Sequence, residues 1–345
     1  MRTGDPVLDR KINELLDSAL TDSDGTVRRD NRDLLRDILT NATLLCRDRA
    51  DRLDLKIAAS ALAEMRAANE MFRPFRGSRK VTIFGSARTS PDSPLYRQTV
   101  AVASRFAAED WMVVTGAGPG IMAAGLEGAG REHALGAAIL LPFESEANEH
   151  LDPDRLVDMR YFFTRKLALI RESDGFIVMP GGFGTLDETF ELLTLLQTGK
   201  AEPVPVVMLG LGQGFWTAWE HFVDTVVEQG YAGASDRSLY RVTNQVDDAV
   251  NEILGFYRNH HSIRWVRDDL VIRVHHAPSP EQLRQLQETF GRYCDGPIAL
   301  TTASRQEITD NDQVDLARIR LRFDRRQPGR LRALIDMVNS FVPKS

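Results

Sequence analysis

The chain has 345 residues with a formal net charge of −6; 43% of its residues are hydrophobic and 27% charged. This composition is typical of a globular protein with about two domains and an extension, and the negative charge argues against a nucleic-acid partner. Cys46 and Cys294 lie far apart and form no CxxC motif, which predicts a reduced, cytoplasmic protein without disulfides. No apolar run approaches the roughly 20 residues that cross a bilayer, so no membrane partner is expected.

Residues 1–77 are predicted to form a helical extension. Apolar side chains recur at helical spacing in three stretches, which lie at residues 8–16, 34–45 and 53–65. The polar faces of these helices mix arginine evenly with aspartate. We therefore interpret them as a solvated extension that packs on the main domain or on another subunit.

Strands alternate with helices between residues 78 and 260. The apolar runs that predict strands lie at residues 81–84, 111–115, 137–141, 159–162, 176–179 and 205–209. Helical periods follow most of them, at residues 96–108, from 121, from 164, from 185 and at 215–227. The alternation predicts an α/β fold, a Rossmann-like, doubly wound parallel sheet. Such a sheet binds its ligand at the carboxyl ends of the strands.

Residues 261–345 are predicted to form a small α+β domain, with a ferredoxin-like arrangement as one option. Its predicted strands and helices lie at residues 270–274, 280–290, 297–301, 316–323 and 330–341. In the last of these strands, apolar residues alternate with Arg318, Arg320 and Arg322. Two interpretations stay open: a solvated sheet face covered by arginine stems, or a site for an anionic effector.

One stretch carries the strongest signal for a ligand. The buried strand at residues 176–179 runs into a glycine loop, and a helical period begins at Thr185. A strand, a glycine loop and a helix in this order direct backbone N–H groups at an anion, and Thr185 is placed to cap the helix or to bind a phosphate. The predicted phosphate site consists of Gly181, Gly182, Phe183, Gly184 and Thr185.

Two carboxylates, Glu188 and Glu191, follow this loop within two helical turns. A carboxylate repels a phosphate, so its presence indicates another task, such as chemistry at a developing positive charge. Arg165 and Lys166 open the preceding helix and can reach the phosphate or Glu188. The alternative is that the glycines only turn the chain and that the helix dipole favours Glu188.

Further candidates follow the other strands, so all could converge at one crevice. They are Gly85, Ser86, Gly116, Gly118, Gly120 and Glu144. The pairs His260-His261 and His275-His276 have no carboxylate or cysteine at ligand spacing, and no metal site is predicted.

The stretch from Pro180 to Glu188, PGGFGTLDE, resembles the PGGxGTxxE signature of the LOG family. Arg165-Lys166 matches the upstream Arg-Lys pair of that family, and residues 116–122, GAGPGIM, resemble its GGGPGIM loop. The resemblance covers roughly residues 79–257. It implies a homo-oligomeric nucleoside 5′-monophosphate phosphoribohydrolase, which hydrolyses the N-glycosidic bond to free base and ribose 5-phosphate without a cofactor.

The resemblance also implies roles for single residues. Arg165 and Glu188 are the implied catalytic pair, and Glu144 and Thr194 line the substrate site. The full set expected around the substrate is Gly85, Ser86, Gly116, Gly118, Gly120, Glu144, Lys166, Gly181, Gly182, Phe183, Gly184, Thr185, Glu191 and Thr194.

The sequence departs from the family pattern at Ala117, where the family has glycine, and at Ala123, where many members have glutamate. The flanking regions are absent from the short cytokinin-activating members. These departures favour AMP-like substrates. Two alternatives remain: a carrier that binds a nucleotide or a molybdenum cofactor without turnover, and a cytokinin riboside 5′-monophosphate phosphoribohydrolase.

Overall fold

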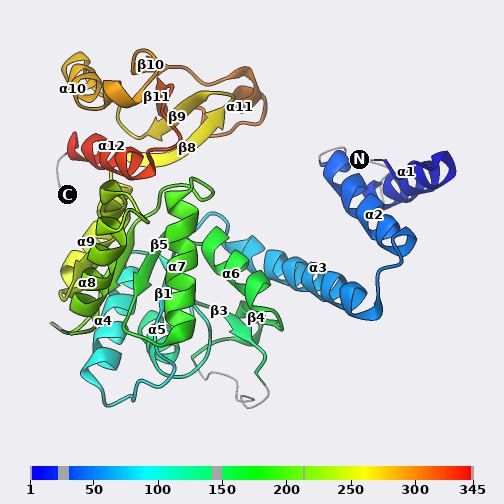
Figure 1. Cartoon of the computed structure of the whole chain (residues 1–345), viewed down its shortest axis with the longest axis horizontal. Coiled ribbons are helices and arrows are strands. Elements are labelled where there is room, and N and C mark those ends of the chain that lie inside the picture. Colours follow the sequence, from blue (N-terminus) through cyan, green and yellow to red (C-terminus); the bar gives the residue numbers. More distant parts are fainter. Residues whose placement is uncertain (1, 22–30, 142–149, 213, 343–345) are drawn as a thin grey trace. The chain divides into compact units, whose positions relative to one another are not determined.

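The computed structural model describes residues 2–21, 31–141, 150–212 and 214–342 (Figure 1). The chain divides into two compact units, which comprise residues 1–64 and 65–345. Among the described residues, no helix is both long enough and apolar enough to span a membrane.

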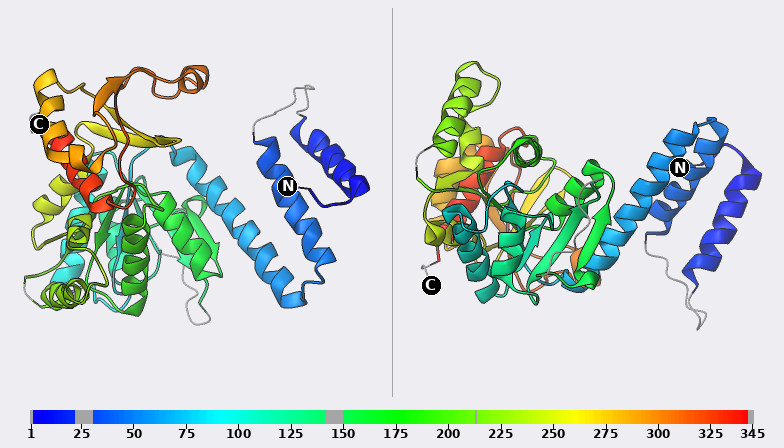
Figure 2. Two further views of the ribbon diagram at one scale, coloured as in Figure 1. Left: turned by 45° about the horizontal axis from the view of Figure 1, so that its top comes forward. Right: turned by 90° about the horizontal axis from the view of Figure 1, so that it is seen from below.

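The first unit is helical, as predicted. Helix α1 (Pro6–Leu20) and helix α2 (Arg32–Arg47) lie side by side (Figures 1 and 2). Asp5 caps α1 by accepting hydrogen bonds from the backbone N–H groups of Val7 and Leu8. The apolar part of the contact between the helices is formed by Ile12, Leu16, Leu20 and Leu39, and Arg32 of α2 pairs with Asp17 of α1.

Helix α3 (Arg52–Phe72) begins in the first unit and ends in the second. Its last turns bury Ala68, Met71 and Phe72 in the core of the second unit. The extension was predicted to run to residue 77. The last turns of α3, from residue 65 on, instead belong to the second unit.

The second unit contains a seven-stranded sheet whose neighbouring strands all pair in parallel. The strands are β1 (Lys80–Phe84), β2 (Met112–Thr115), β3 (Ala134–Ile139), β4 (Leu156–Met159), β5 (Gly175–Val178), β6 (Val206–Leu209) and β7 (Arg241–Thr243). Their order is β4-β3-β2-β1-β5-β6-β7. This order confirms the predicted doubly wound α/β fold, and it changes direction between β1 and β5.

Helices cover both faces of this sheet (Figure 1). One face packs against α4 (Pro94–Ala108), α5 (Ile121–Ala129) and α9 (Val246–Phe256). The other face packs against the end of α3 and against α6 (Phe162–Arg171), α7 (Phe183–Gln197) and α8 (Phe215–Glu228). Strands that are buried on both faces explain the continuous apolar runs in the sequence.

A four-stranded antiparallel sheet follows, in the order β10-β11-β9-β8. Its strands are β8 (His260–Val266), β9 (Asp269–Val274), β10 (Ala299–Thr301) and β11 (Ala317–Leu321). Its helices are α10 (Pro280–Phe290), α11 (Arg305–Thr309) and α12 (Pro328–Ser340). The α+β class is as predicted, but the ferredoxin-like option is wrong. That arrangement starts β-α-β, whereas this domain starts with the β8–β9 hairpin.

The arginine row of β11 is only partly solvated. Arg318 is 2% exposed, whereas Arg320 and Arg322 are exposed and lie near Asp269. The guanidinium of Arg318 donates to the carbonyls of Leu316 (2.5 Å) and Gln313 (2.8 Å), and it pairs with Glu307. A solvated face formed by all three arginines is therefore wrong, because α11 places Glu307 over Arg318. The guanidinium of Arg318 is engaged inside the protein, which leaves Arg320 and Arg322 for the proposed anionic effector.

Candidate functional site

The candidate site lies where the strand order changes direction, at the carboxyl ends of β1 and β5. The loop after β1 and the loop after β5 run side by side. The N–H of Ser86 donates to the carbonyl of Pro180 (3.3 Å), and the N–H of Met179 donates to that of Phe84 (2.8 Å). The loop after β2 joins them, because the N–H of Ile121 donates to the carbonyl of Ser86 (3.0 Å). Three strand ends thus meet at one edge, as the sequence predicts.

Three glycines allow these loops to approach closely. A Cβ atom at Gly85 would lie 2.4 Å from the side chain of Ile121, and one at Gly181 would lie 2.3 Å from Oγ1 of Thr185. Gly120 has φ +66°, and a Cβ atom there would lie 2.4 Å from the carbonyl oxygen of Ser86. These glycines are required for packing between the loops, so their contribution to ligand binding is indirect.

Gly182 and Gly184 differ from these three, because no heavy atom lies within 4 Å of a Cβ atom built on either. Gly182 is the N-cap of α7, and no side chain caps the helix. The first N–H groups of α7 therefore have no side-chain cap, a feature that suits an anion. Thr185, expected as a cap, is the third residue of α7 and is buried against Gly181. Phe183 is 94% exposed at the rim of this opening.

Arg165 and Glu188 face each other beside the opening. Nη1 of Arg165 lies 3.6 Å from Oε1 of Glu188, and their side chains are 8% and 12% exposed. Nε of Arg165 donates to the carbonyl of Ala137 at the end of β3 (2.9 Å). A Cβ atom at Gly116 would lie 2.0 Å from Nη2 of Arg165, so this glycine makes room for the guanidinium. The structure thus brings the expected catalytic pair together.

Burial raises the pKa of Glu188 above its usual range, although the charges of Arg165 and Lys166 oppose this rise. A carboxyl with a raised pKa takes up a proton more readily than a solvated one, and in its charged form it stabilises a nearby cation. The guanidinium of Arg165 holds a fixed positive charge at the same place. An anion-binding helix terminus beside such a pair fits acid–base chemistry on a phosphorylated ligand.

Lys166 points to α7. Its Nζ lies 2.7 Å from Oδ2 of Asp187 and 2.7 Å from Oε2 of Glu191. Burial opposes its charge, but the hydrogen bonds with these two carboxylates raise the pKa of Lys166 overall. Asp187 is a residue of this site that sequence reasoning missed; its signal is its place beside Glu188, one turn before Glu191.

The remaining expected residues are less central. Gly118 is half-buried in the loop after β2, and Thr194 is exposed two turns beyond Glu188 on α7. Glu144 lies outside the described residues. Among the residues that the structure describes, no group of three or more His, Cys, Asp or Glu side chains could hold a metal ion.

Ala117, the residue that replaces a family glycine, has a left-handed backbone with φ 57°. The N–H of Ala117 donates to Oγ1 of Thr115 at the end of β2 (3.1 Å), so the strand end keeps its geometry. An alanine in this conformation costs roughly 1 kcal/mol relative to glycine. The preference of the family for glycine is therefore a backbone effect.

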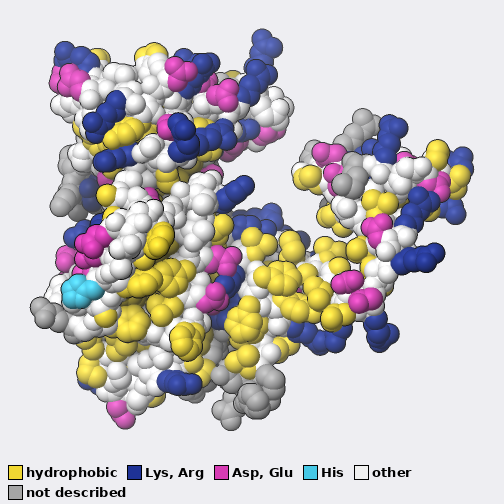
Figure 3. Space-filling view, viewed as in Figure 1, with side chains coloured by type: hydrophobic (Ala, Val, Ile, Leu, Met, Phe, Trp, Pro, Cys, Tyr) yellow, Lys and Arg dark blue, Asp and Glu magenta, His cyan; other side chains and the backbone are white. Residues whose placement is uncertain are grey.

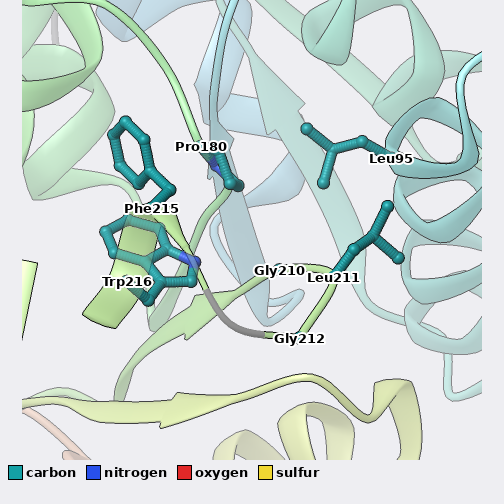
Figure 4. A pocket seen from close by; sticks show the side chains of 7 residues that line it. All are labelled: Leu95, Pro180, Gly210, Leu211, Gly212, Phe215 and Trp216. Carbon is teal, nitrogen blue, oxygen red and sulfur yellow. The ribbon is translucent and has the colours of Figure 1, made fainter. Parts of the chain in front are cut away.

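A cavity of about 140 Å³ lies between Pro180 and the residues that follow β6 (Figure 4). It is lined by Leu95, Pro180, Gly210, Leu211, Gly212, Phe215 and Trp216. The lining is apolar, and the cavity meets the phosphate loop only through Pro180. It therefore contributes no charged group to the candidate site.

The fold and this geometry define an α/β protein with a candidate anion site at the switch point of a parallel sheet. Residues 119–253 match the family described as "Possible lysine decarboxylase". Cytokinin riboside 5′-monophosphate phosphoribohydrolases LOG1 and LOG4 of Arabidopsis thaliana are 27% and 29% identical over 136 residues. The aligned residues are 39% of this chain and span 62% and 61% of those relatives. The matches confirm the resemblance predicted from the motifs: residues 119–253 are similar to the LOG family.

Solved structures with a similar chain path include the molybdenum cofactor binding protein of Rippkaea orientalis, at 17% identity and a TM-score of 0.39. A second is the molybdenum cofactor carrier protein of Chlamydomonas reinhardtii, at 20% identity and a TM-score of 0.37. Each alignment covers 50% of this chain and 94% of the other.

Proposed function

We propose that the protein is a nucleoside 5′-monophosphate phosphoribohydrolase. The observation that carries this proposal is the buried Arg165–Glu188 pair, 3.6 Å apart, beside the uncapped, glycine-rich start of α7. The names of the LOG relatives support the same class of reaction. In this proposal the start of α7 is the counterpart of the substrate phosphate, and the Arg165–Glu188 pair is the counterpart of the reacting carbon.

In this proposal the first N–H groups of α7 hold the 5′-phosphate and so fix the ribose beside Glu188. The bond from C1′ to the base nitrogen breaks, and its electron pair leaves with the base. The positive charge that develops on the sugar is stabilised by the carboxylate of Glu188. The oxygen of a water molecule bonds to C1′ and gives one proton to Glu188, and Glu188 then passes this proton to the departed base, so that its carboxylate is regenerated. The products are free base and ribose 5-phosphate.

The test is release of ribose 5-phosphate from a panel of AMP, GMP, CMP, UMP and a cytokinin riboside 5′-monophosphate. We expect turnover of the common nucleotides, and AMP-like substrates to be preferred. Glu188→Gln should reduce kcat by at least about 100-fold with little change in nucleotide affinity, whereas the exposed Glu220→Gln on α8 is the matched control. Nucleotide or molybdenum-cofactor binding without any release would instead support a carrier.

We further propose that the enzyme acts as a homodimer or a higher homo-oligomer. Apolar side chains gather on the surface over α6 and α7 (Figure 3). On α6 the exposed fractions are 51% for Phe162, 53% for Phe163 and 48% for Leu167. A second copy would cover such a surface. Light scattering should give a multiple of the 38.7 kDa chain mass, which Phe163→Glu with Leu167→Glu should reduce and the exposed Ile308→Glu on α11 should not.

A further inference from the structure

Lys166 is the neighbour of Arg165 on α6, and its ammonium group is shared between two carboxylates of α7. Both contacts are 2.7 Å long, and the Lys166 side chain is 11% exposed. The acceptors, Asp187 and Glu191, lie one residue before and three residues after Glu188 on the same helix. Lys166 therefore connects the helix of Arg165 to the helix of Glu188 on both sides of that carboxylate.

This arrangement is unsuited to a phosphate ligand. A phosphate monoester carries a charge of about −1.5 to −2 at pH 7. At Nζ of Lys166 it would meet Asp187 and Glu191, whose side chains are 57% and 43% exposed and lie in contact with the same nitrogen. The charge of Lys166 is thus already balanced by α7 itself.

We propose that Lys166 is a positioning residue, which holds α6 against α7 so that Arg165 and Glu188 keep their separation, and that it does not bind the substrate phosphate. The idea rests on the proposed function for its catalytic consequence. Arg165 is fixed at its other end by the carbonyl of Ala137. A shift of α7 relative to α6 would therefore change the distance to Glu188 directly.

The same contacts set the charge around Glu188. In the described part of the chain, the charged groups that act on it are Arg165 and Lys166 from α6, and Asp187 from α7. Arg165 and Lys166 favour the carboxylate, and Asp187 disfavours it. Removal of the Lys166 charge would leave the carboxylates of Asp187 and Glu191 uncompensated beside Glu188. The pKa of Glu188 should then rise further.

The first experiment separates positioning from phosphate binding through steady-state kinetics. Lys166→Met should lower kcat by about 100-fold, the effect of displacing a catalytic group by about 1 Å. KM should change less than about threefold. Lys166→Arg should keep most of the wild-type rate. The exposed Lys200→Met is the control. A KM raised more than about tenfold at unchanged kcat would identify Lys166 as a phosphate ligand and overturn the proposal.

A double-mutant cycle adds a second criterion. Asp187→Asn combined with Glu191→Gln should cause a similar loss of kcat, and adding Lys166→Met to this pair should cost little more, because all three side chains act as one unit. If kcat of the triple variant fell by the product of the two separate losses, Lys166 and the two carboxylates would act independently. That result would contradict the proposal.

A third measurement does not depend on turnover. The carboxyl carbon of Glu188, assigned by its loss in Glu188→Gln, is titrated by ¹³C NMR in the full chain. Lys166→Met should raise its pKa by about one unit, and Lys166→Arg should leave it near the wild-type value. An unchanged titration in Lys166→Met would overturn the proposal. If the wild type hydrolyses no nucleotide while this shift is seen, the proposed function fails and the positioning role stands.

Discussion

His260 should make the folded protein sensitive to mild acid. It is the first residue of β8, its ring is 3% exposed, and neither ring nitrogen has a hydrogen-bond partner in the described part of the chain. The rings of Phe256 and Tyr257 pack against it, with centroids 5.0 Å and 5.9 Å away. The charged or titratable groups that act on it are all basic: Arg79 before β1, His261 on β8, Arg332 on α12 and His275 after β9.

Burial, followed by the charge of Arg79, lowers the pKa of His260 to about 3, from 6.5. The folded protein keeps the ring neutral, whereas the unfolded chain binds a proton below about pH 6.5. Stability is therefore complete above that pH and falls as the pH drops, by about 1.4 kcal/mol per unit until the folded pKa is reached. At pH 5 the loss from this one ring is about 2 kcal/mol.

The assay is urea unfolding of the wild type and of His260→Phe at pH 7.5 and pH 5. Phenylalanine cannot be protonated, so the variant should lose about 2 kcal/mol less free energy of unfolding between the two pH values. The exposed His221→Phe on α8 is the matched control and should behave as the wild type. The titration of His261 and His275 affects both proteins and cancels in the comparison. Equal losses in wild type and His260→Phe would refute the reasoning.

Three further changes test the packing. Ala117→Gly should raise the free energy of unfolding by about 1 kcal/mol, because it relieves the left-handed φ of 57°; an unchanged urea midpoint would contradict this. Gly120→Ala should lower the free energy of unfolding by about 1–3 kcal/mol. It should also weaken phosphate binding measured by calorimetry, and unchanged binding would show that the loops after β1 and β2 can move apart without loss of the site. Glu307→Gln should cost about 1–3 kcal/mol, since it removes the carboxylate that Arg273 and Arg318 share, while Arg273 keeps its pair with Asp312; an unchanged midpoint in thermal or urea unfolding would contradict this.

The sequence predicted the sheet and the edge that carries the site. Buried runs such as residues 176–179, broken by glycine and followed by a helical period, have few other structural solutions. The small edge strand β7 and the strand β8 were missed. β7 has three residues, with arginine at its start, and β8 begins with two histidines, so neither shows an apolar run. Short or polar strands are held by their neighbours, which a local pattern does not contain.

The orientation of α7 shows why periodicity is misleading at a site. The helical period that begins at Thr185 has apolar residues at Leu186, Phe190 and Leu193, yet Phe190 is 42% exposed. The helix buries Thr185, Glu188, Thr189, Leu192 and Leu196. Three of these five buried residues are polar, because this face forms part of the candidate site, where local rules are broken for function.

The contacts of Lys166 and Arg318 could not be predicted for a related reason. A basic residue next to Arg165, or in alternation along β11, is equally suited to a ligand and to a carboxylate of the same chain. The choice depends on which acidic side chain the fold brings near: Asp187 and Glu191 for Lys166, and Glu307 for Arg318. This information is long-range, and the sequence distance of 21 residues between Lys166 and Asp187 carries no local signal.

Helix α7 explains how one short motif can combine opposite charges. Its uncapped start carries the partial positive charge of the helix, and Glu188 follows Gly182 by six residues, or about 9 Å along the axis. That separation is comparable to the span of a ribose 5-phosphate, so phosphate and sugar carbon can meet different ends of the same rigid element. A carboxylate closer to the loop would repel the phosphate, and one on another helix would move relative to it. The spacing within the motif therefore suits the substrate that we propose.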